Sequence, residues 1–244
     1  MTESALYDRI GRSYVATRGE DPRIAARIHA ALGDAHTVLN VGAGAGAYEP
    51  RDRDVTAVEP SPVMRAQRPP GAAPCIDARA EALPFGDGTF DATMAVLSDH
   101  HWSDRLGGLR ELRRVGRRAV VFQWDPSYAD SFWLIRDHLR SFRDLQASFG
   151  ELEEALGATR QEVVPIAHDC RDGFLMAYWR RPEAYLDPAV RANISVFALL
   201  PAAEVDAMVD ALRADLRSGE WERRNADLLA RDEHDFGYRL LVAE

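Results

Sequence analysis

The amino-acid sequence predicts a single α/β domain in which helices cover both faces of a doubly wound, mainly parallel sheet. Short runs of β-branched and apolar residues alternate with amphipathic stretches in the first half of the chain, and alternation of this kind builds a parallel sheet. Glycines at alternate positions follow the first run, where the backbone has to turn sharply. The length of 244 residues suits one such domain, which we expect to span residues 1–244.

The first predicted elements are two helices within residues 1–33. Apolar side chains recur at helical spacing over residues 6–14, which indicates the first helix. Asp21 and the proline after it give the second helix an N-cap and a favourable first position, and Gly33 is expected to end it.

Four short apolar runs predict the buried strands of a core that spans residues 34–125. The predicted strands are residues 37–41, 55–58, 90–96 and 119–122. Helices are expected between them from Ser61 to Gln67 and from Ser103 to Val115, where the leucines of the second stretch fall on one face.

After Trp124 the regular alternation of short predicted strands and helices ends. A helical segment is expected over residues 126–159 on the substrate side, followed by a strand at 162–167 and a last strand at 237–243. Residues 168–235 are too many for a simple connection between these two strands, so they predict a helical cap inserted there.

The composition excludes several classes of protein. All 30 basic residues are arginine, which rules out Schiff-base lysine chemistry and the phosphate-binding lysines of P-loop proteins and kinases. The formal charge is −9 and the arginines are interleaved with acids, so we expect no nucleic-acid partner. No apolar stretch could cross a membrane and no leader is visible, so a cytoplasmic protein without membrane contact is expected, of unspecified oligomeric state.

The strongest local signal is the glycine run from Val41 to Gly46, directly after a predicted strand. Glycines there let the backbone approach a ligand closely and present free N–H groups. Glu59, at the end of the next predicted strand, can accept both hydroxyls of an adenosine ribose, so the arrangement is Rossmann-like. Read with Ala47, the run also fits the relaxed dinucleotide pattern GxGxxA, so the residues alone leave a dinucleotide and S-adenosylmethionine (SAM) both open.

Four motifs follow one another in the core: VLNVGAGAG at 38–46, VEPS at 58–61, AEALPFGDGTFD at 80–91 and ELRRV at 111–115. In this order and spacing they resemble the small-molecule branch, methyltransferase type 11-like, of the class I SAM-dependent methyltransferases. The resemblance implies a Rossmann-like, seven-stranded, mainly parallel sheet, SAM as the cofactor and a small molecule as the methyl acceptor.

The same resemblance implies which residues contact the cofactor. Gly42, Gly44 and Gly46 would line the methionine and ribose side of SAM, and Glu59 would hold the ribose hydroxyls.

On the adenine side, the resemblance implies that Pro60 and Met64 flank the ring and that the backbone of Ala80 contacts its edge. Leu97 would lie below the sulfonium. Simple core packing is the alternative for Met64 and for Leu97.

Two positions depart from the family pattern. Asn40 stands where an acidic residue usually opens the glycine motif, and Arg79 stands where an aspartate often accepts from the adenine amino group. Because arginine has no acceptor atom, we expect adenine recognition from the backbone, from Asp77 or by guanidinium stacking.

Tyr7, Tyr14 and Arg18 resemble the Y-x(6)-Y-x(3)-R pattern that often precedes this fold. The pattern implies tyrosines that close over the site, with Tyr14 and Arg18 at the cofactor and Tyr7 at the substrate. An arginine suits the carboxylate of SAM because it can make two parallel hydrogen bonds. A surface arginine with tyrosines that face the core is the alternative.

Candidate catalytic residues follow the strand predicted at 90–96, in the run from Ser98 to Trp102. A histidine there could act as a general base near neutral pH, and His100 is slightly favoured over His101. Trp102 is a candidate substrate contact. Alternatively, the segment only caps a helix and packs.

A second cluster opens the predicted cap. His168, Trp179 and Arg180 are candidate substrate contacts, because aromatic rings beside arginines can bind a flat or anionic molecule; an ordinary amphipathic helix is the alternative. Cys75 and Cys170 lack a CxxC partner, and adjacent residues rarely converge on one ion, so no metal is predicted.

Three functions remain open on the sequence alone, of which a small-molecule methyltransferase is favoured. A nicotinamide-dependent oxidoreductase is disfavoured by the LPF-x-D-x-x-F-D motif and by the absence of lysine. A SAM-binding protein without catalysis would be indicated if the cap left no cavity beside the sulfonium. Nothing in the sequence selects an O, N, C or S nucleophile.

Overall fold

The computed structural model describes most of the chain. The described residues are 19–139, 141–142, 149–158 and 160–244. Three residues predicted to contact cofactor or substrate, Tyr7, Tyr14 and Arg18, lie outside them.

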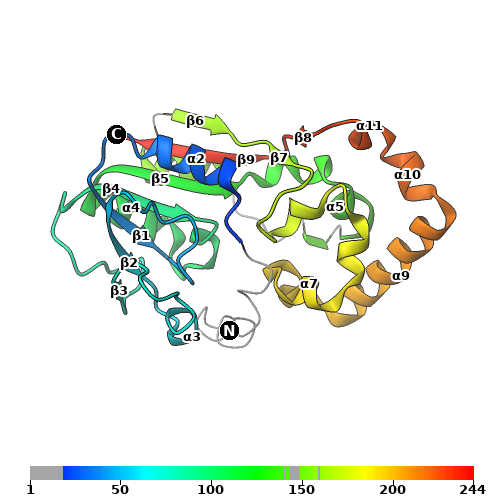
Figure 1. Cartoon of the computed structure of the whole chain (residues 1–244), viewed down its shortest axis with the longest axis horizontal. Coiled ribbons are helices and arrows are strands. Elements are labelled where there is room, and N and C mark those ends of the chain that lie inside the picture. Colours follow the sequence, from blue (N-terminus) through cyan, green and yellow to red (C-terminus); the bar gives the residue numbers. More distant parts are fainter. Residues whose placement is uncertain (1–18, 140, 143–148, 159) are drawn as a thin grey trace.

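A seven-stranded sheet forms one half of the molecule, in the order β3-β2-β1-β4-β5-β9-β6 (Figure 1). Neighbouring strands from β3 to β5 are parallel, and β9 runs antiparallel to both β5 and β6. The sheet confirms the doubly wound, mainly parallel fold. Its strands are β1 (Thr37–Val41), β2 (Asp54–Val58), β3 (Cys75–Ile76), β4 (Phe90–Val96), β5 (Gly116–Trp124), β6 (Arg160–Val163) and β9 (Tyr238–Ala243).

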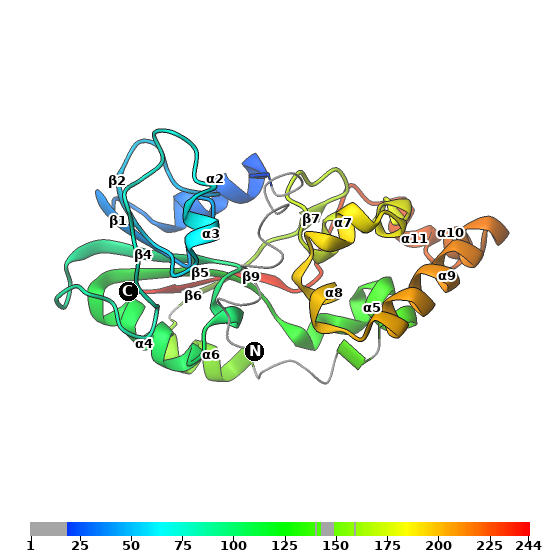
Figure 2. The same cartoon turned by 90° about the horizontal axis from the view of Figure 1, so that it is seen from below.

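Helices cover both faces of this sheet (Figure 2). Helix α2 (Pro22–Ala31) lies on one face, and helices α4 (Arg105–Val115) and α6 (Phe149–Leu156) lie on the other. Val38 and Leu39 are neighbours on β1, yet they belong to the two different buried clusters. Because successive side chains of a strand point to opposite faces, nearly continuous apolar runs supply both cores.

The direction of winding reverses between β1 and β4. The chain moves outward from β1 through β2 to β3, returns to β4 beside β1, and continues to β5 on the other side. Ligands of open α/β sheets bind at such a point, outside the carboxyl ends of the strands. Here the segments after β1 and β4 meet, because the Ser98 hydroxyl donates to the Val41 carbonyl at 3.0 Å.

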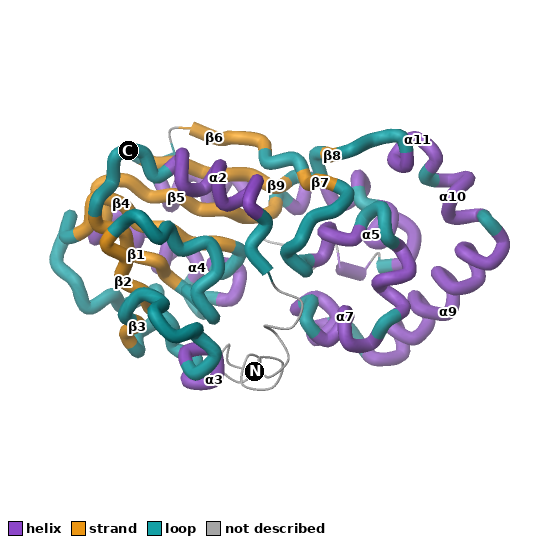
Figure 3. The backbone as a smooth tube through the Cα atoms, in the orientation of Figure 1, coloured by secondary structure: helices purple, strands orange, loops and turns teal. Residues whose placement is uncertain are grey.

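Most of the chain after β5, apart from α6, β6 and β9, builds a mostly helical cap beside the sheet, and Figure 3 shows the two parts as a strand-rich and a helix-rich half. A short ribbon, β7 (Ile166–Ala167) with β8 (Glu233–His234), adjoins it. None of the helices in the described part of the chain is long and apolar enough to cross a membrane. The remaining cap elements are η2 (Pro126–Ser131), α5 (Trp133–His138), η4 (Leu175–Tyr178), η5 (Pro182–Leu186), α7 (Pro188–Ala192), α8 (Ser195–Leu199), α9 (Ala202–Ser218), α10 (Glu220–Arg224) and α11 (Ala226–Leu229).

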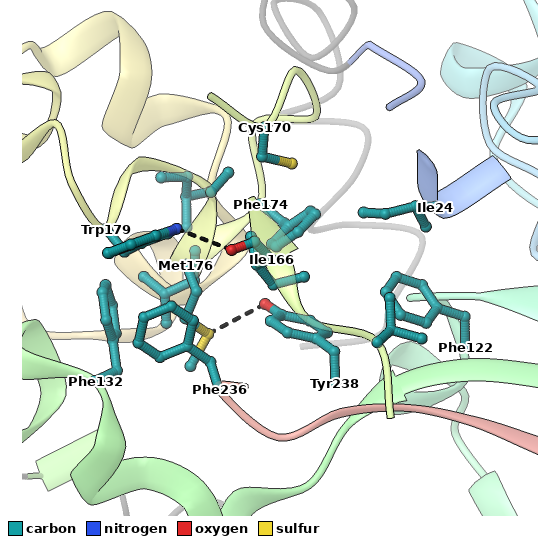
Figure 4. Packing of buried hydrophobic residues seen from close by; sticks show 14 of the residues in the cluster. Ile24, Phe122, Phe132, Ile166, Cys170, Phe174, Met176, Trp179, Phe236 and Tyr238 are labelled. Carbon is teal, nitrogen blue, oxygen red and sulfur yellow. Dashed lines mark hydrogen bonds between the residues drawn. The ribbon is translucent and has the colours of Figure 1, made fainter. Parts of the chain in front are cut away.

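Large buried side chains join the cap to the sheet (Figure 4). Tyr238 of β9 stacks on Phe122 of β5 with ring centroids 5.6 Å apart, and its hydroxyl donates to the Met176 sulfur at 3.1 Å. The indole N–H of Trp179 donates to the Ile166 carbonyl at 3.1 Å. These contacts hold the cap against the carboxyl end of β5.

Two predicted elements differ from the structure, and a third element was missed. The strand predicted at 162–167 is divided into β6 and β7 around Pro165, because proline has no N–H for a sheet ladder. The helix predicted from Ser61 to Gln67 is the shorter α3 (Pro62–Arg65), and the two-residue β3 was not predicted at all.

Candidate functional site

The turn after β1 brings main-chain groups to the carboxyl edge of the sheet. Gly42 and Gly44 have φ angles of 69° and 52°, a region that side chains disfavour. A Cβ on Gly42 would lie 2.7 Å from the Cβ of Ser98, closer than two carbons can approach. The Gly42 N–H donates to the Val58 carbonyl at 2.9 Å, which fixes the turn to β2. Because Gly42 has no side chain, this turn can pack directly against Ser98 and keep its backbone conformation.

Glu59 follows β2 and lies beside this turn, with only 7% of its surface exposed. Its Oε2 accepts the Gly44 N–H at 2.9 Å, and its Oε1 accepts the Ser61 N–H at 2.8 Å. Burial raises the pKa of the Glu59 carboxyl above its ordinary value of 4.5. A carboxylate offers roughly four lone-pair positions, so each oxygen can still accept a further donor such as a ribose hydroxyl.

These groups line a hollow that we call the first pocket, with about 950 Å³ of empty space, part of it open to solvent. It gathers most of the predicted cofactor contacts. The predicted residues that line it are Gly42, Gly44, Glu59, Pro60, Met64, Ala80 and Leu97. The predicted contact Gly46 is not among its lining residues, and a Cβ there would meet the Arg68 guanidinium instead.

The two side chains considered for adenine recognition take different places. Arg79 lines the first pocket, together with Ala80 and Glu81. Asp77 does not line it, because its exposed carboxylate pairs with Arg65 Nη2 at 2.8 Å. Asp77 therefore lies outside the expected site. Of the groups expected to recognise adenine, the backbone and the Arg79 guanidinium are the ones that line the first pocket.

Asn40 belongs to a hydrogen-bonded group with Glu49 and Arg68, two residues that were not predicted from the sequence. Its Nδ2 donates to Glu49 Oε1 at 3.1 Å, and Arg68 Nη2 donates to both Glu49 oxygens at 2.8 Å. This ion pair is largely buried, with side-chain exposures of 6% for Arg68 and 10% for Glu49. A carboxylate from position 49 therefore lies beside Asn40, although Glu49 is not among the residues that line the first pocket. The unusual Asn40 was the only signal for it in the sequence.

A second pocket adjoins the first on the side of the cap. Leu97, His101 and Trp102 line both pockets and form their common wall. The rest of the second pocket is mostly apolar and comes from β5, β9, η4, α8 and Phe142. Its apolar side chains are Trp124, Phe142, Phe174, Leu175, Met176, Ile194, Val196, Leu199 and Tyr238.

The short helix η1 (Asp99–His101) gives the two candidate histidines different positions. His101 is half-buried and lines both pockets, whereas His100 is exposed and lines only the second. Their ring centroids are 3.9 Å apart with the planes tilted by 46°. The slight preference for His100 is therefore reversed, because the turn of η1 puts His101 at the junction.

Leu97 at the common wall has a φ of 49°, which is unusual for a residue with a side chain. Its N–H donates to the Phe122 carbonyl of β5 at 2.8 Å, so the sheet ladder holds this conformation. Strained residues held in this way are frequent where a ligand has to be positioned.

The cap residues predicted to contact substrate line neither pocket. Trp179 is fully buried in the core of the cap, and Arg180 donates to the Arg231 carbonyl at 2.8 Å. His168 lies in the turn after β7, where its N–H donates to the Asp232 carbonyl at 2.9 Å. We correct this prediction, since η4 presents Leu175 and Met176 to the second pocket instead.

Comparison with known protein families and with solved structures identifies the relatives of this chain. A family model described as "Methyltransferase domain" matches residues 39–122. The chain is 31% identical to a protein from Anabaena variabilis whose crystal structure is described as a "Putative methyltransferase from antibiotic biosynthesis pathway". The match covers 93% of this chain and 99% of that chain, with a TM-score of 0.84.

More distant matches share the fold or one segment. The geranyl diphosphate C-methyltransferase of Streptomyces coelicolor, crystallised with Mg²⁺, geranyl diphosphate and S-adenosyl-L-homocysteine, is 15% identical, with a TM-score of 0.50 over 91% of this chain and 78% of that one. An uncharacterized Escherichia coli protein, YafE, is 36% identical over 75 residues, which make up 26% of this chain and 36% of that protein. This chain therefore spans little more than a third of that curated relative.

Proposed function

Because the chain belongs to the class I SAM-dependent methyltransferases, with SAM as its cofactor, we propose that it methylates a small organic molecule bound in the second pocket. In this proposal residues 34–125 bind SAM in the first pocket, and the cap, residues 168–235 together with 126–159, encloses the acceptor. The Anabaena variabilis relative supports a small acceptor, because it is described as part of an antibiotic biosynthesis pathway.

The first pocket fits SAM in two respects. Gly42 and Gly44 line this pocket without side chains, so a ligand can lie close to the main chain there. Glu59 adds a buried carboxylate whose two oxygens each hold one backbone N–H and retain capacity for a ribose hydroxyl. We therefore assign Glu59 to the ribose, and Pro60, Met64, Arg79 and the Ala80 backbone to the adenine side.

The common wall of the two pockets is the observation that carries the proposal. Leu97, His101 and Trp102 line both, so an acceptor in the second pocket and a cofactor in the first would meet at these side chains. Placing two reactants in contact and in line is the main task of a methyltransferase. A SAM-binding protein without catalysis would have no need of this second cavity.

The chemistry requires little from the protein beyond position. When bound, SAM supplies a methyl group on a positively charged sulfur. An acceptor atom held in line would form its bond to the methyl carbon as the carbon–sulfur bond breaks, with S-adenosylhomocysteine as the leaving group. For an O–H or N–H acceptor, we assign the proton to the His101 imidazole at the junction. Leu97 and Trp102 would exclude water and orient the acceptor.

The test is methyl transfer from labelled SAM to a panel of phenols, carboxylic acids, amines and thiols, followed by mass spectrometry. We expect one class to gain a methyl group with matching release of S-adenosylhomocysteine. His101→Gln should lower kcat by roughly 10²–10⁴-fold for an O–H or N–H acceptor and remove the acid limb of the pH profile. His100→Gln is the matched control: His100 lines only the second pocket, so this variant should retain the acid limb of the pH profile. Transfer only to protein or nucleic acid would contradict the proposal.

A further inference from the structure

A buried amide stands in the wall of the second pocket. Gln123 lies near the end of β5, its side chain is 1% exposed, and it lines this pocket. Its Nε2 finds no hydrogen-bond partner among the described residues. An unpaired buried N–H group is destabilising, so an amide kept in this state points to a ligand that completes it.

The orientation of this amide is fixed by two further buried residues. Arg105 donates through Nη2 to Gln123 Oε1, and arginine carries only donors, so the amide oxygen has to face it. Asp99, which is fully buried, holds Arg105 by accepting from its Nε at 2.8 Å and its Nη2 at 2.7 Å. The amide NH₂ group is thereby turned away from Arg105 and kept there.

The position of the amide relates it to the site of methyl transfer. Leu97, in the common wall, donates its N–H to the carbonyl of Phe122, the residue before Gln123. Neighbouring strands are about 5 Å apart, so the Gln123 backbone lies one strand away from the wall where the two pockets meet, and Leu97 and Gln123 line the same pocket. A group that accepts from Gln123 would therefore be close to the acceptor atom itself.

The charge and the walls of the second pocket limit the ligand further. Arg105 is the only guanidinium among its described lining residues, and Asp99 already balances its charge. Aromatic and aliphatic side chains form most of the remaining wall, including Trp124, Phe174 and Tyr238. Such a pocket favours an uncharged, flat, apolar molecule over a phosphate or a polyamine.

We propose that the acceptor is a largely apolar, aromatic molecule with a carbonyl-type oxygen close to the methylated atom, and that this oxygen accepts a hydrogen bond from Gln123 Nε2. Asp99 and Arg105 are positioning residues that act through the amide. The inference rests on the proposed function, since it names the class of acceptor for the second pocket.

Calorimetric binding of two matched probes, with S-adenosylhomocysteine present, tests the proposal without turnover. 2-Acetylnaphthalene carries a carbonyl, and 2-isopropenylnaphthalene has a CH₂ group in place of the oxygen. The native protein should bind the carbonyl compound about three- to tenfold more tightly. Equal binding of the two probes, or no binding of either, would overturn the proposal.

Two variants assign the preference to the amide. Gln123→Leu removes the donor, and Gln123→Glu keeps an acceptor for Arg105 while replacing the NH₂ group by an oxygen. Both should bind the two probes equally, with unchanged affinity for S-adenosylhomocysteine; a preference that survives in Gln123→Glu would refute the role of the amide. Arg105→Met should reduce the preference for the carbonyl probe, and Arg105→Lys should keep part of it. A general folding defect would weaken the binding of both probes and leave the ratio of their affinities unchanged.

The binding experiment and the methyl-transfer assay can give opposite answers, so failure of the Gln123 proposal can be distinguished from failure of the proposed function. Carbonyl preference that depends on Gln123, together with no methyl transfer to any small molecule, would support the amide as a ligand anchor and reject the transferase assignment of this pocket. Methyl transfer to small molecules without any dependence on Gln123 would do the opposite.

Discussion

The first and second pockets share a wall, but they are made of different groups. Main-chain N–H groups, glycines and one buried carboxylate form the centre of the first pocket, and both oxygens of Glu59 already have backbone partners. The second pocket is formed by side chains from the sheet and the cap, most of them apolar, and it contains an amide nitrogen with no partner among the described residues.

This difference reflects what each pocket has to bind. A cofactor is the same molecule in every turnover, so a rigid main-chain cradle suits it. An acceptor site is defined by side chains, which can change from one enzyme to another while the sheet stays the same. Substitutions confined to the first pocket should therefore weaken cofactor binding whatever the acceptor, and substitutions confined to the second should change which acceptor binds.

The largest effect is expected for Gly44→Val. The Gly44 φ of 52° disfavours a β-branched residue, and a Cβ there would come within 3.3 Å of the Met64 methyl group inside the first pocket. S-adenosylhomocysteine affinity should fall on the order of a hundredfold or more, or about 3 kcal/mol, by calorimetry.

Gly71→Val is the matched control for this substitution. Gly71 also has a positive φ, of 83°, but no atom lies within 4 Å of its Cβ position. The backbone strain is then similar while the first pocket is untouched, so cofactor affinity should stay native. Equal loss of affinity in both variants would attribute the effect to strain and not to the shape of the pocket.

The next largest effect concerns the charge of Glu59. Loss of the carboxylate in Glu59→Gln should weaken S-adenosylhomocysteine binding about tenfold to a hundredfold, since hydrogen bonds to charged groups contribute roughly 1.5–3 kcal/mol. In the native protein the same affinity should decline as the pH falls through the raised pKa of Glu59, whereas the variant should lack this decline. Calorimetry between pH 8 and the ordinary glutamate pKa of 4.5 measures both.

The stability of the unliganded protein should respond in the opposite sense. Because burial raises the pKa of Glu59 in the folded state, its contribution is most favourable below the ordinary pKa and is lost as the pH rises through the folded one. Glu111 is the control, because the hydrogen bond from Arg114 lowers its pKa. Glu111→Gln should therefore lower the free energy of unfolding at neutral pH, and this difference from the native protein should vanish in acid. The same pH trend for both variants would contradict the burial argument.

Much of the first pocket could be predicted from the sequence, because its determinants are local. The strands predicted at 37–41 and 90–96 coincide with β1 and β4, and the residues after them form the site. Glycines and a carboxylate at strand ends keep their meaning in any α/β sheet. Glu49 was missed because its partners Asn40 and Arg68 lie nine and 19 residues away in the sequence.

The second pocket could not be predicted in the same way, because its determinants are contacts between distant segments. Gln123 was only one residue of a predicted strand, and its role depends on Arg105 and on the cap. Trp179 was expected at the substrate, yet the Trp133 indole, 46 residues earlier, donates to its carbonyl inside the cap core. Neither partner can be identified from spacing or composition.

The smallest effect is expected where the two parts of the molecule are joined, at the Tyr48 hydroxyl. Tyr48 lines the first pocket, is 1% exposed, and donates to Asp172 Oδ2, at the start of the cap, at 2.9 Å. Tyr48→Phe deprives that buried carboxylate of a donor, which should cost about 1–2 kcal/mol of unfolding free energy and lower Tm by roughly 2–8 °C. Cofactor affinity should change no more than about threefold, because the phenyl ring keeps the wall of the first pocket.

Tyr185→Phe separates this link from ordinary loss of a buried hydrogen bond. The Tyr185 hydroxyl donates to the Leu175 carbonyl at 2.6 Å, entirely within the cap. Hydrogen exchange of the cap helices α7 to α11 should slow when S-adenosylhomocysteine binds to the native protein and to Tyr185→Phe, and should slow less in Tyr48→Phe. An equal response in all three would mean that the cap responds to the first pocket through the common wall at Leu97, and that the Tyr48 hydroxyl contributes to stability alone.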